Sequence, residues 1–130
     1  MNINTPLLDA YRNSYFFINK EIGLIDFAVI TAWNPFGKLM SNSVNQRANY
    51  DLECDILKQN YEKLLVGDIN REWTEESFAV EMPLVEAVEL GKKYNQNAIY
   101  YVRNDRLFLV SCVDNNADES EIAQFSQRVK

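Results

Sequence analysis

An almost uninterrupted apolar run, Phe27 to Trp33, stops abruptly at the pair Asn34-Pro35. The run is short for a helix and rich in β-branched and aromatic residues, which favours a strand. Because it lacks polar alternation, we expect both faces to be covered and the strand to lie centrally in its sheet. Proline ends the ladder, so Trp33 and Asn34 should stand at the carboxyl end of this strand. In open α/β sheets ligands bind outside such ends, which makes this the expected site.

The rest of the chain predicts helices and strands on either side of this central strand. Pro6 suits the first turn of a short helix that ends near Asn13, and a strand over 15–18 should form an antiparallel pair with the central strand. We expect further helices over about 43–59 and 83–95, strands over 61–66, 78–82, 98–102 and 107–110, a tight hairpin turn at Asn104-Asp105, and a terminal helix or frayed tail over 118–130.

This order of elements predicts an α/β (α+β) fold in a single domain over residues 1–130. From the central strand onward the order contains β-α-β-β-α-β, the split pattern of ferredoxin-like folds. We therefore expect a two-layer sandwich, in which helices pack on a mixed or antiparallel sheet of about six strands. A ferredoxin-like core is one arrangement of these elements.

Charge and residue types exclude several classes of function. The chain has 13 basic and 19 acidic residues and a net charge of -6, which argues against nucleic acid as the main partner. It has no histidine, so imidazole-based triads and histidine metal sites are excluded, and we expect neither a metal nor a cofactor. The sequence shows neither a membrane span nor a secretory signal, so we expect a cytoplasmic protein. Cys54 and Cys112 lack a disulfide or zinc pattern, and we expect buried thiols.

Neutral amides gather at the expected ends of strands and helices. An amide offers both a donor and an acceptor, and a nearby aromatic ring offers a stacking face, which together suit a flat polar ligand such as a nucleotide or a related heterocycle. On this hypothesis the ligand contacts come from Trp33, Asn34, Asn45, Trp73, Gln96 and Asn97. The alternative is that these amides bond to the backbone at turns and helix starts while the two tryptophans fill the core.

Two adjacent carboxylates, Glu75 and Glu76, support a second hypothesis, a carboxylate-dependent hydrolase. A glutamate beside an apolar ring has a raised pKa, which suits a general base, and it can also bind a metal. Adjacent residues of a strand point to opposite faces, so at most one of the pair faces a pocket. The alternative is that both are solvated. A third hypothesis is a protein-interaction module that docks a partner at the edge of the last hairpin or at the terminal helix through an exposed apolar patch.

Several segments, in order, resemble the uncharacterised bacterial family DUF3293. They are the Ile-Thr-Ala-Trp-Asn-Pro segment at 30–35, Asn45 at the start of a helix, Trp73 followed by Glu75 and Glu76, the Gln-Asn-Ala segment at 96–98, and an early Tyr11-Arg12. The chain departs from the family at Asn95, where glycine is usual, and at Arg47, which is displaced by one position and so has a weaker claim to a role. The resemblance implies a fold and a site location without naming an activity. The function that we expect is therefore the binding of a small polar or nucleotide-like ligand.

Overall fold

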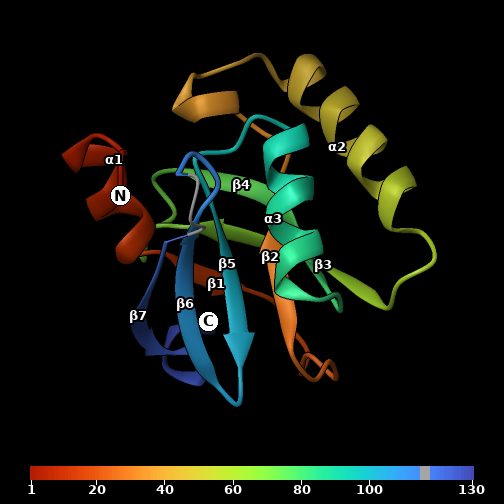
Figure 1. Cartoon of the computed structure of the whole chain (residues 1–130), viewed down its shortest axis with the longest axis vertical. Helices are drawn as coiled ribbons and strands as arrows, with labels where there is room; N and C mark the ends of the chain where they lie inside the picture. Colours follow the sequence, from red (N-terminus) through yellow and green to blue (C-terminus); the bar gives the residue numbers. More distant parts are fainter. Residues whose placement is uncertain (115–117) are drawn as a thin grey trace.

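The computed structural model describes residues 1–114 and 118–130 (Figure 1). Within these ranges seven strands form one antiparallel sheet, in the order β1-β3-β4-β2-β5-β6-β7. The strands are β1 Tyr15–Phe17, β2 Phe27–Ile30, β3 Tyr61–Gly67, β4 Thr74–Val80, β5 Ala98–Arg103, β6 Arg106–Ser111 and β7 Glu119–Gln124. The helices are α1 Thr5–Arg12, α2 Asn42–Ile56 and α3 Leu84–Lys93, with short 3-10 turns η1 Pro35–Gly37 and η2 Phe125–Arg128. The predicted α+β class is confirmed.

Strand β2 occupies the middle of the sheet, as its apolar sequence predicts, and all four of its residues are buried. It ends at Ile30, earlier than the predicted strand, because side chains take the next backbone N–H groups. The N–H of Ala32 donates to Asn49 Oδ1 at 2.8 Å, and the N–H of Trp33 donates to Thr31 Oγ1 at 3.1 Å. The chain after Ile30 is therefore held by side chains in place of a neighbouring strand.

One face of the sheet is covered by α2 and α3, which lie together on the same side of the molecule (Figure 1). Leu52 and Ile56 of α2 and Ala87 of α3 pack there against buried side chains of β2, β4 and β5, such as Ile30. We call this the outer face. No helix within the described ranges has both the length and the apolar character needed to cross a bilayer.

The other face encloses a second apolar core, because the sheet curls. Phe16, Phe27, Tyr100 and Phe125 belong to this inner core, and α1 packs against it from the opposite side to α2 and α3 (Figure 1). The expected two-layer sandwich accounts only for the outer face. Side-chain alternation along the strands supplies both cores, since successive residues point to opposite faces of the sheet.

The curl brings the two ends of the sheet together. Phe16 of β1 forms a parallel bridge with Val129, and the backbone N–H of Lys130 donates to the carbonyl of Phe16 at 2.9 Å. Strands β1, β6 and β7 therefore extend the sheet and bend it towards closure, so the ferredoxin-like core is not confirmed as a description of this fold. The sheet also has seven strands in the described residues, against about six expected.

Two further expectations about pairing and secondary structure are wrong. Strand β1 pairs with β3 and not with β2, because β2 already has β4 and β5 as neighbours. Residues 119–124 form strand β7 where a terminal helix or tail is expected. Pairing with β6 decides this segment, and an ion pair of 2.9 Å joins Arg106 to Glu121 across the two strands. Tertiary pairing outweighs the weak helical pattern of the sequence.

Candidate functional site

A cavity of about 340 Å³ opens at the end of the curl where β2 finishes and β4 and β5 begin. We call it the inner pocket, because its floor is the inner face of the sheet. Helix α1 and the segment after β2 close it from the sides. Its wall includes Leu7, Tyr11, Val29, Thr31, Asn34, Val66, Trp73, Glu75, Gln96, Tyr100 and Leu109. Asn34, Trp73, Glu75 and Gln96, all sequence-predicted candidates, thus come together in one cavity.

Glu75 places a carboxylate in this pocket, while its neighbour Glu76 points to the outer face. Glu75 Oε2 accepts a hydrogen bond of 2.8 Å from Asn34 Nδ2. Burial raises the pKa of Glu75, and the hydrogen bond from Asn34 opposes this effect in part. Alternation along β4 sends the carboxylate of Glu76 the other way, where it accepts a hydrogen bond of 2.7 Å from Gln46 of α2.

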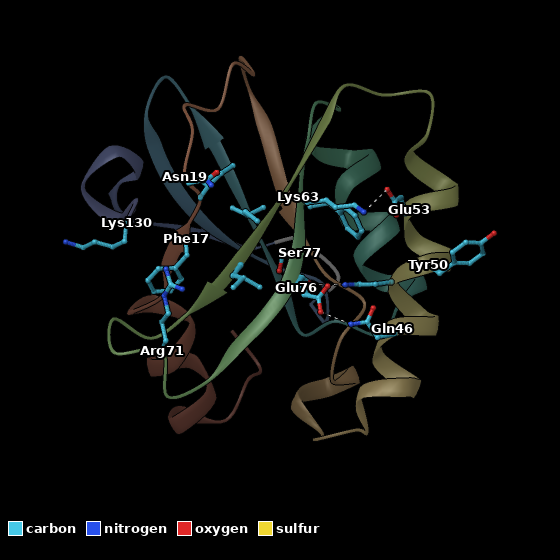
Figure 2. Close-up of a pocket in the computed structure, with 15 residues that line it drawn as sticks. Phe17, Asn19, Gln46, Tyr50, Glu53, Lys63, Arg71, Glu76, Ser77 and Lys130 are labelled. Carbon is cyan, nitrogen blue, oxygen red and sulfur yellow. Dashed lines mark hydrogen bonds and ion pairs between the residues drawn. The ribbon is translucent and has the colours of Figure 1, made fainter.

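The outer face carries a wider and more open groove of about 810 Å³ between α2 and β1 (Figure 2). Its rim is charged: Glu53 pairs with Lys63 at 3.6 Å, and the Arg71 guanidinium lies 4.2 Å from the ring centroid of Phe17. Glu76 is the sequence-predicted candidate that lines this groove. The other candidates gather around the inner pocket, which we therefore take as the candidate site.

Asn34 is the hub of a network of amides beside the pocket. Its backbone is left-handed, with φ of 49°, and its N–H donates to Asn45 Oδ1 at 3.0 Å. Its own Oδ1 accepts from Asn45 Nδ2 and from the N–H of Met40, both at 3.0 Å. Asparagine tolerates this conformation better than most residues. These contacts fix the turn after β2.

Asn49, one turn after Asn45 on the buried side of α2, extends this network. Besides the bond from Ala32, its Nδ2 donates to the carbonyl of Glu76 at 2.8 Å. The side chain of Asn49 alone thus connects α2 to the end of β2 and to β4. The helical spacing of asparagines predicts this inward face, although it does not predict the partners.

Gln96 and Asn97 hold two other parts of the pocket wall. Gln96 Nε2 lies 3.1 Å from the carbonyls of Trp33 and Tyr94. Asn97 Nδ2 donates to the hydroxyl of Tyr11 at 3.3 Å. Trp33 itself is absent from the pocket wall, and its buried Nε1 has no partner among the described residues. Of the two tryptophans, Trp73 is therefore the one that faces the pocket.

Two tyrosines complete the site, and the sequence reasoning missed both as pocket residues. The Tyr100 hydroxyl lies 2.7 Å from Ser14 Oγ and 2.8 Å from the carbonyl of Tyr11. Burial raises the pKa of Tyr100 and of Tyr11; the nearby charge of Glu75 adds to the shift of each, and the hydrogen bond from Asn97 opposes that of Tyr11. The early Tyr-Arg pair was a signal for Tyr11. In the sequence Tyr100 looks like an ordinary core residue of a strand, so its place in the pocket wall follows only from the register of the sheet.

The cysteines lie away from this network. Cys112 is buried as expected, but Cys54 is exposed on α2, so the expectation of two buried thiols is wrong for Cys54. Its helical position turns it away from the stripe formed by Leu52 and Ile56. In the part of the chain that the structure describes, no three cysteine or acidic side chains gather as a metal site requires.

Glu75 gives the protein a predictable dependence of stability on pH. Because burial raises its pKa in the folded state, the folded protein binds this proton more tightly than the unfolded chain does, between the ordinary and the raised pKa. Its contribution to the free energy of unfolding therefore falls as the pH rises through that window. Tyr11 and Tyr100, the other titratable groups of the pocket wall, have pKa values raised above 10.0 and stay neutral there.

Glu75→Gln should remove this dependence on pH. The free energy of unfolding of the variant, relative to that of the wild type, should therefore be higher at about pH 7 than at about pH 4. Urea unfolding at the two pH values measures the difference. Glu76→Gln, a change on the other face of the same strand, is the matched control. Parallel stability profiles for the wild type and Glu75→Gln would contradict the buried position of this carboxyl group.

Comparison with known proteins identifies a family whose function is unknown. The family described as Protein of unknown function (DUF3293) matches residues 30–99. The matched region runs from the end of β2 to the beginning of β5 and includes Asn34, Asn45 and Glu75. No curated protein and no solved structure matches the chain.

Proposed function

The chain belongs to the DUF3293 family of proteins of unknown function, and from the geometry of its site we propose that the inner pocket binds a small organic ligand. The observation that carries the proposal is a mainly apolar cavity of about 340 Å³ with a carboxylate, Glu75, held inside it. Small-molecule sites are typically concave and apolar, with a few fixed polar groups and volumes of roughly 300–1,000 Å³. The inner pocket has each of these properties.

The charge of the pocket narrows the class of ligand. No lysine or arginine belongs to its described wall, whereas Glu75 contributes an acidic group. A phosphate would meet this carboxylate without a compensating cation, so the phosphates of a nucleotide fit poorly. A neutral or cationic heterocycle that donates a hydrogen bond to Glu75 fits better. The proposed ligand therefore has a flat ring like that of a nucleotide but no phosphate groups.

The amide side chains mainly hold the wall of this pocket in place, and they contribute less to direct contacts with a ligand. Asn34 and Asn45 bond to each other and to the turn after β2, and Gln96 bonds to two carbonyls. Their hydrogen bonds are already made before any ligand arrives. The polar contacts to a ligand therefore fall to Glu75 and to the hydroxyl of Tyr11.

A carboxylate-dependent reaction is the second candidate function, and the raised pKa of Glu75 favours it. A general base works best when its pKa lies near the working pH, and burial moves Glu75 in that direction. Glu76 lies on the outer face, so Glu75 would act alone among the two candidates. This role requires the same pocket and is tested by turnover of any ligand found there.

A docking role would use a different surface from the one expected. Strand β7 covers the edge of the last hairpin, and β7 with the short η2 stands where the terminal helix is expected. Exposed apolar side chains instead cluster in sequence around η1 and the start of α2, at Phe36, Leu39, Met40 and Val44. Binding of a partner protein there remains a proposal separate from the pocket.

A thermal-shift screen with neutral and cationic heterocycles tests the ligand proposal. A ligand at about 100 times its dissociation constant adds about 2.7 kcal/mol to the free energy of unfolding, which raises the melting temperature by several degrees. We expect such a shift for the wild type and for Glu76→Gln. It should be lost or strongly reduced in Glu75→Gln, and also in Ala98→Leu, which places a larger side chain in the pocket wall.

Two results would speak against the proposal. A screen without any hit would contradict ligand binding, and hits that persist in both Glu75→Gln and Ala98→Leu would move the site elsewhere. The amide spectra of the unliganded variants show whether each one is folded, so that a lost shift is not confused with a lost structure.

A further inference from the structure

Of the polar side chains that line the inner pocket, Glu75 and Tyr11 are each held by a neutral amide. Asn34 Nδ2 donates to Glu75 Oε2 at 2.8 Å, and Asn97 Nδ2 donates to the hydroxyl of Tyr11 at 3.3 Å. Each contact uses one side of the group and leaves the other side open. Among the described residues, Glu75 Oε1 has no donor and the hydroxyl proton of Tyr11 has no acceptor. Glu75 therefore offers a strong acceptor, and Tyr11 offers a donor.

A single ligand that fills the inner pocket can reach both the acceptor and the donor. Both line the same cavity, and the charge of Glu75 contributes to the raised pKa of Tyr11. No hydrogen bond joins the two side chains in the described structure, so neither group satisfies the other. A group that lies between them can donate to Glu75 and accept from Tyr11 at the same time.

The surrounding wall selects a flat and mainly apolar body for that group. The indole of Trp73 and the buried ring of Tyr100 belong to the wall, together with aliphatic side chains such as Val29 and Leu109. Aromatic and aliphatic surfaces favour a ring that leaves water for the pocket. Cationic side chains are absent from the described wall, which removes the usual partners of carboxylates and phosphates.

We infer that the inner pocket recognises neutral cyclic amides, rings in which an N–H stands beside a C=O. The ring N–H donates to Glu75, and the ring carbonyl accepts from the hydroxyl of Tyr11. 2-Pyridones, 2-quinolones, pyrimidine-diones and oxopurines all carry this edge. The inference rests on the proposed function and narrows it to one ligand class. It also gives Asn34 and Asn97 a role as positioning residues, which orient the two contacting groups.

Matched bicyclic probes separate this class from others of the same size. The first is 2-quinolone, which carries the complete amide edge, and the second is N-methyl-2-quinolone, which lacks the donor. The third is tetrahydroisoquinoline, a cationic amine that can use the carboxylate alone. Titrations followed by two-dimensional amide NMR, together with the indole signal of Trp73, give a dissociation constant and the location of each probe.

We expect 2-quinolone to bind about tenfold or more tightly than its N-methyl form, since the methyl group leaves Glu75 without its donor. Tyr11→Phe should weaken 2-quinolone about fivefold and leave the N-methyl form weak. Tyr50→Phe, at an exposed tyrosine of α2, is the matched control and should change nothing. Glu75→Gln should reduce the preference for the N–H form, because a glutamine side chain is a weaker acceptor than a carboxylate.

These outcomes distinguish the cyclic-amide inference from the broader proposal that the inner pocket binds a small ligand. Equal affinities for the three probes, or tighter binding of the amine, with signals that move at the pocket, would overturn the cyclic-amide inference and leave the pocket as a ligand site. Binding of other fragments from the screen at the pocket, without any of the cyclic amides, would also overturn it. The absence of any pocket ligand would remove the proposed function itself.

Discussion

Replacing Asn49 with leucine is expected to lower the free energy of unfolding by about 3 kcal/mol. The amide accepts a hydrogen bond of 2.8 Å from the N–H of Ala32, a residue that is only 2% exposed. It also donates to the carbonyl of Glu76 at 2.8 Å. Leucine has a similar size but no polar atoms, so the buried N–H of Ala32 loses its partner. Urea unfolding followed by tryptophan fluorescence measures the change.

Gln46→Leu is the matched control for this prediction. Gln46 lies on the same helix and also contacts Glu76, but it is exposed and its hydrogen bond reaches only the carboxylate. We expect this variant to stay within about 0.5 kcal/mol of the wild type. If Asn49→Leu were as stable as the control, the turn after β2 would not depend on the buried amide, and the assigned network would be wrong.

Phe16→Ala is expected to cost about 4 kcal/mol of unfolding free energy, the largest effect among these predictions. Phe16 is fully buried in the inner core, and its ring centroid lies 5.1 Å from those of both Tyr100 and Phe125. Removing the ring leaves a cavity between β1, β5 and η2. Chemical denaturation of the purified variant measures the loss.

The control for Phe16 is another phenylalanine in the opposite environment. Phe36 is 56% exposed in η1, so Phe36→Ala removes little buried surface and should change stability by about 0.5 kcal/mol or less. A cost below about 1.5 kcal/mol for Phe16→Ala would mean that the inner core collapses around the gap. The close packing of the three rings would then contribute less than their contacts indicate.

The sequence predicts what depends on local pattern. The apolar run of β2, the spacing of Leu52 and Ile56 on α2, and the tight hairpin turn at Asn104-Asp105 all appear in the structure as expected. Each of these features is decided by a few neighbouring residues. Alternation along β4 also predicts that Glu75 and Glu76 separate onto two faces, and it is local in the same sense.

What the sequence does not predict depends on contacts between distant segments. The pairing of β1 with β3 and of β6 with β7 is decided by which edges remain free once the sheet curls. The inner pocket depends on this curl as well, because it brings Tyr11 of α1 beside Glu75 of β4. Amide side chains look the same in a sequence whether they bond to backbone or to ligand. The partners of Asn49, the N–H of Ala32 and the carbonyl of Glu76, are visible only in three dimensions.

The bridge between Phe16 and Val129 also bears on the order in which the fold is completed. It joins segments from nearly opposite ends of the chain, and Arg128 adds hydrogen bonds of 2.9 Å to the carbonyls of Arg12 and Ser14. Contacts so distant in sequence form slowly, since a long loop must close before they contribute any stability. During synthesis the strands that form the pocket floor leave the ribosome before the segment that closes the curl. The curl can therefore close only after the segment around Val129 has been synthesised.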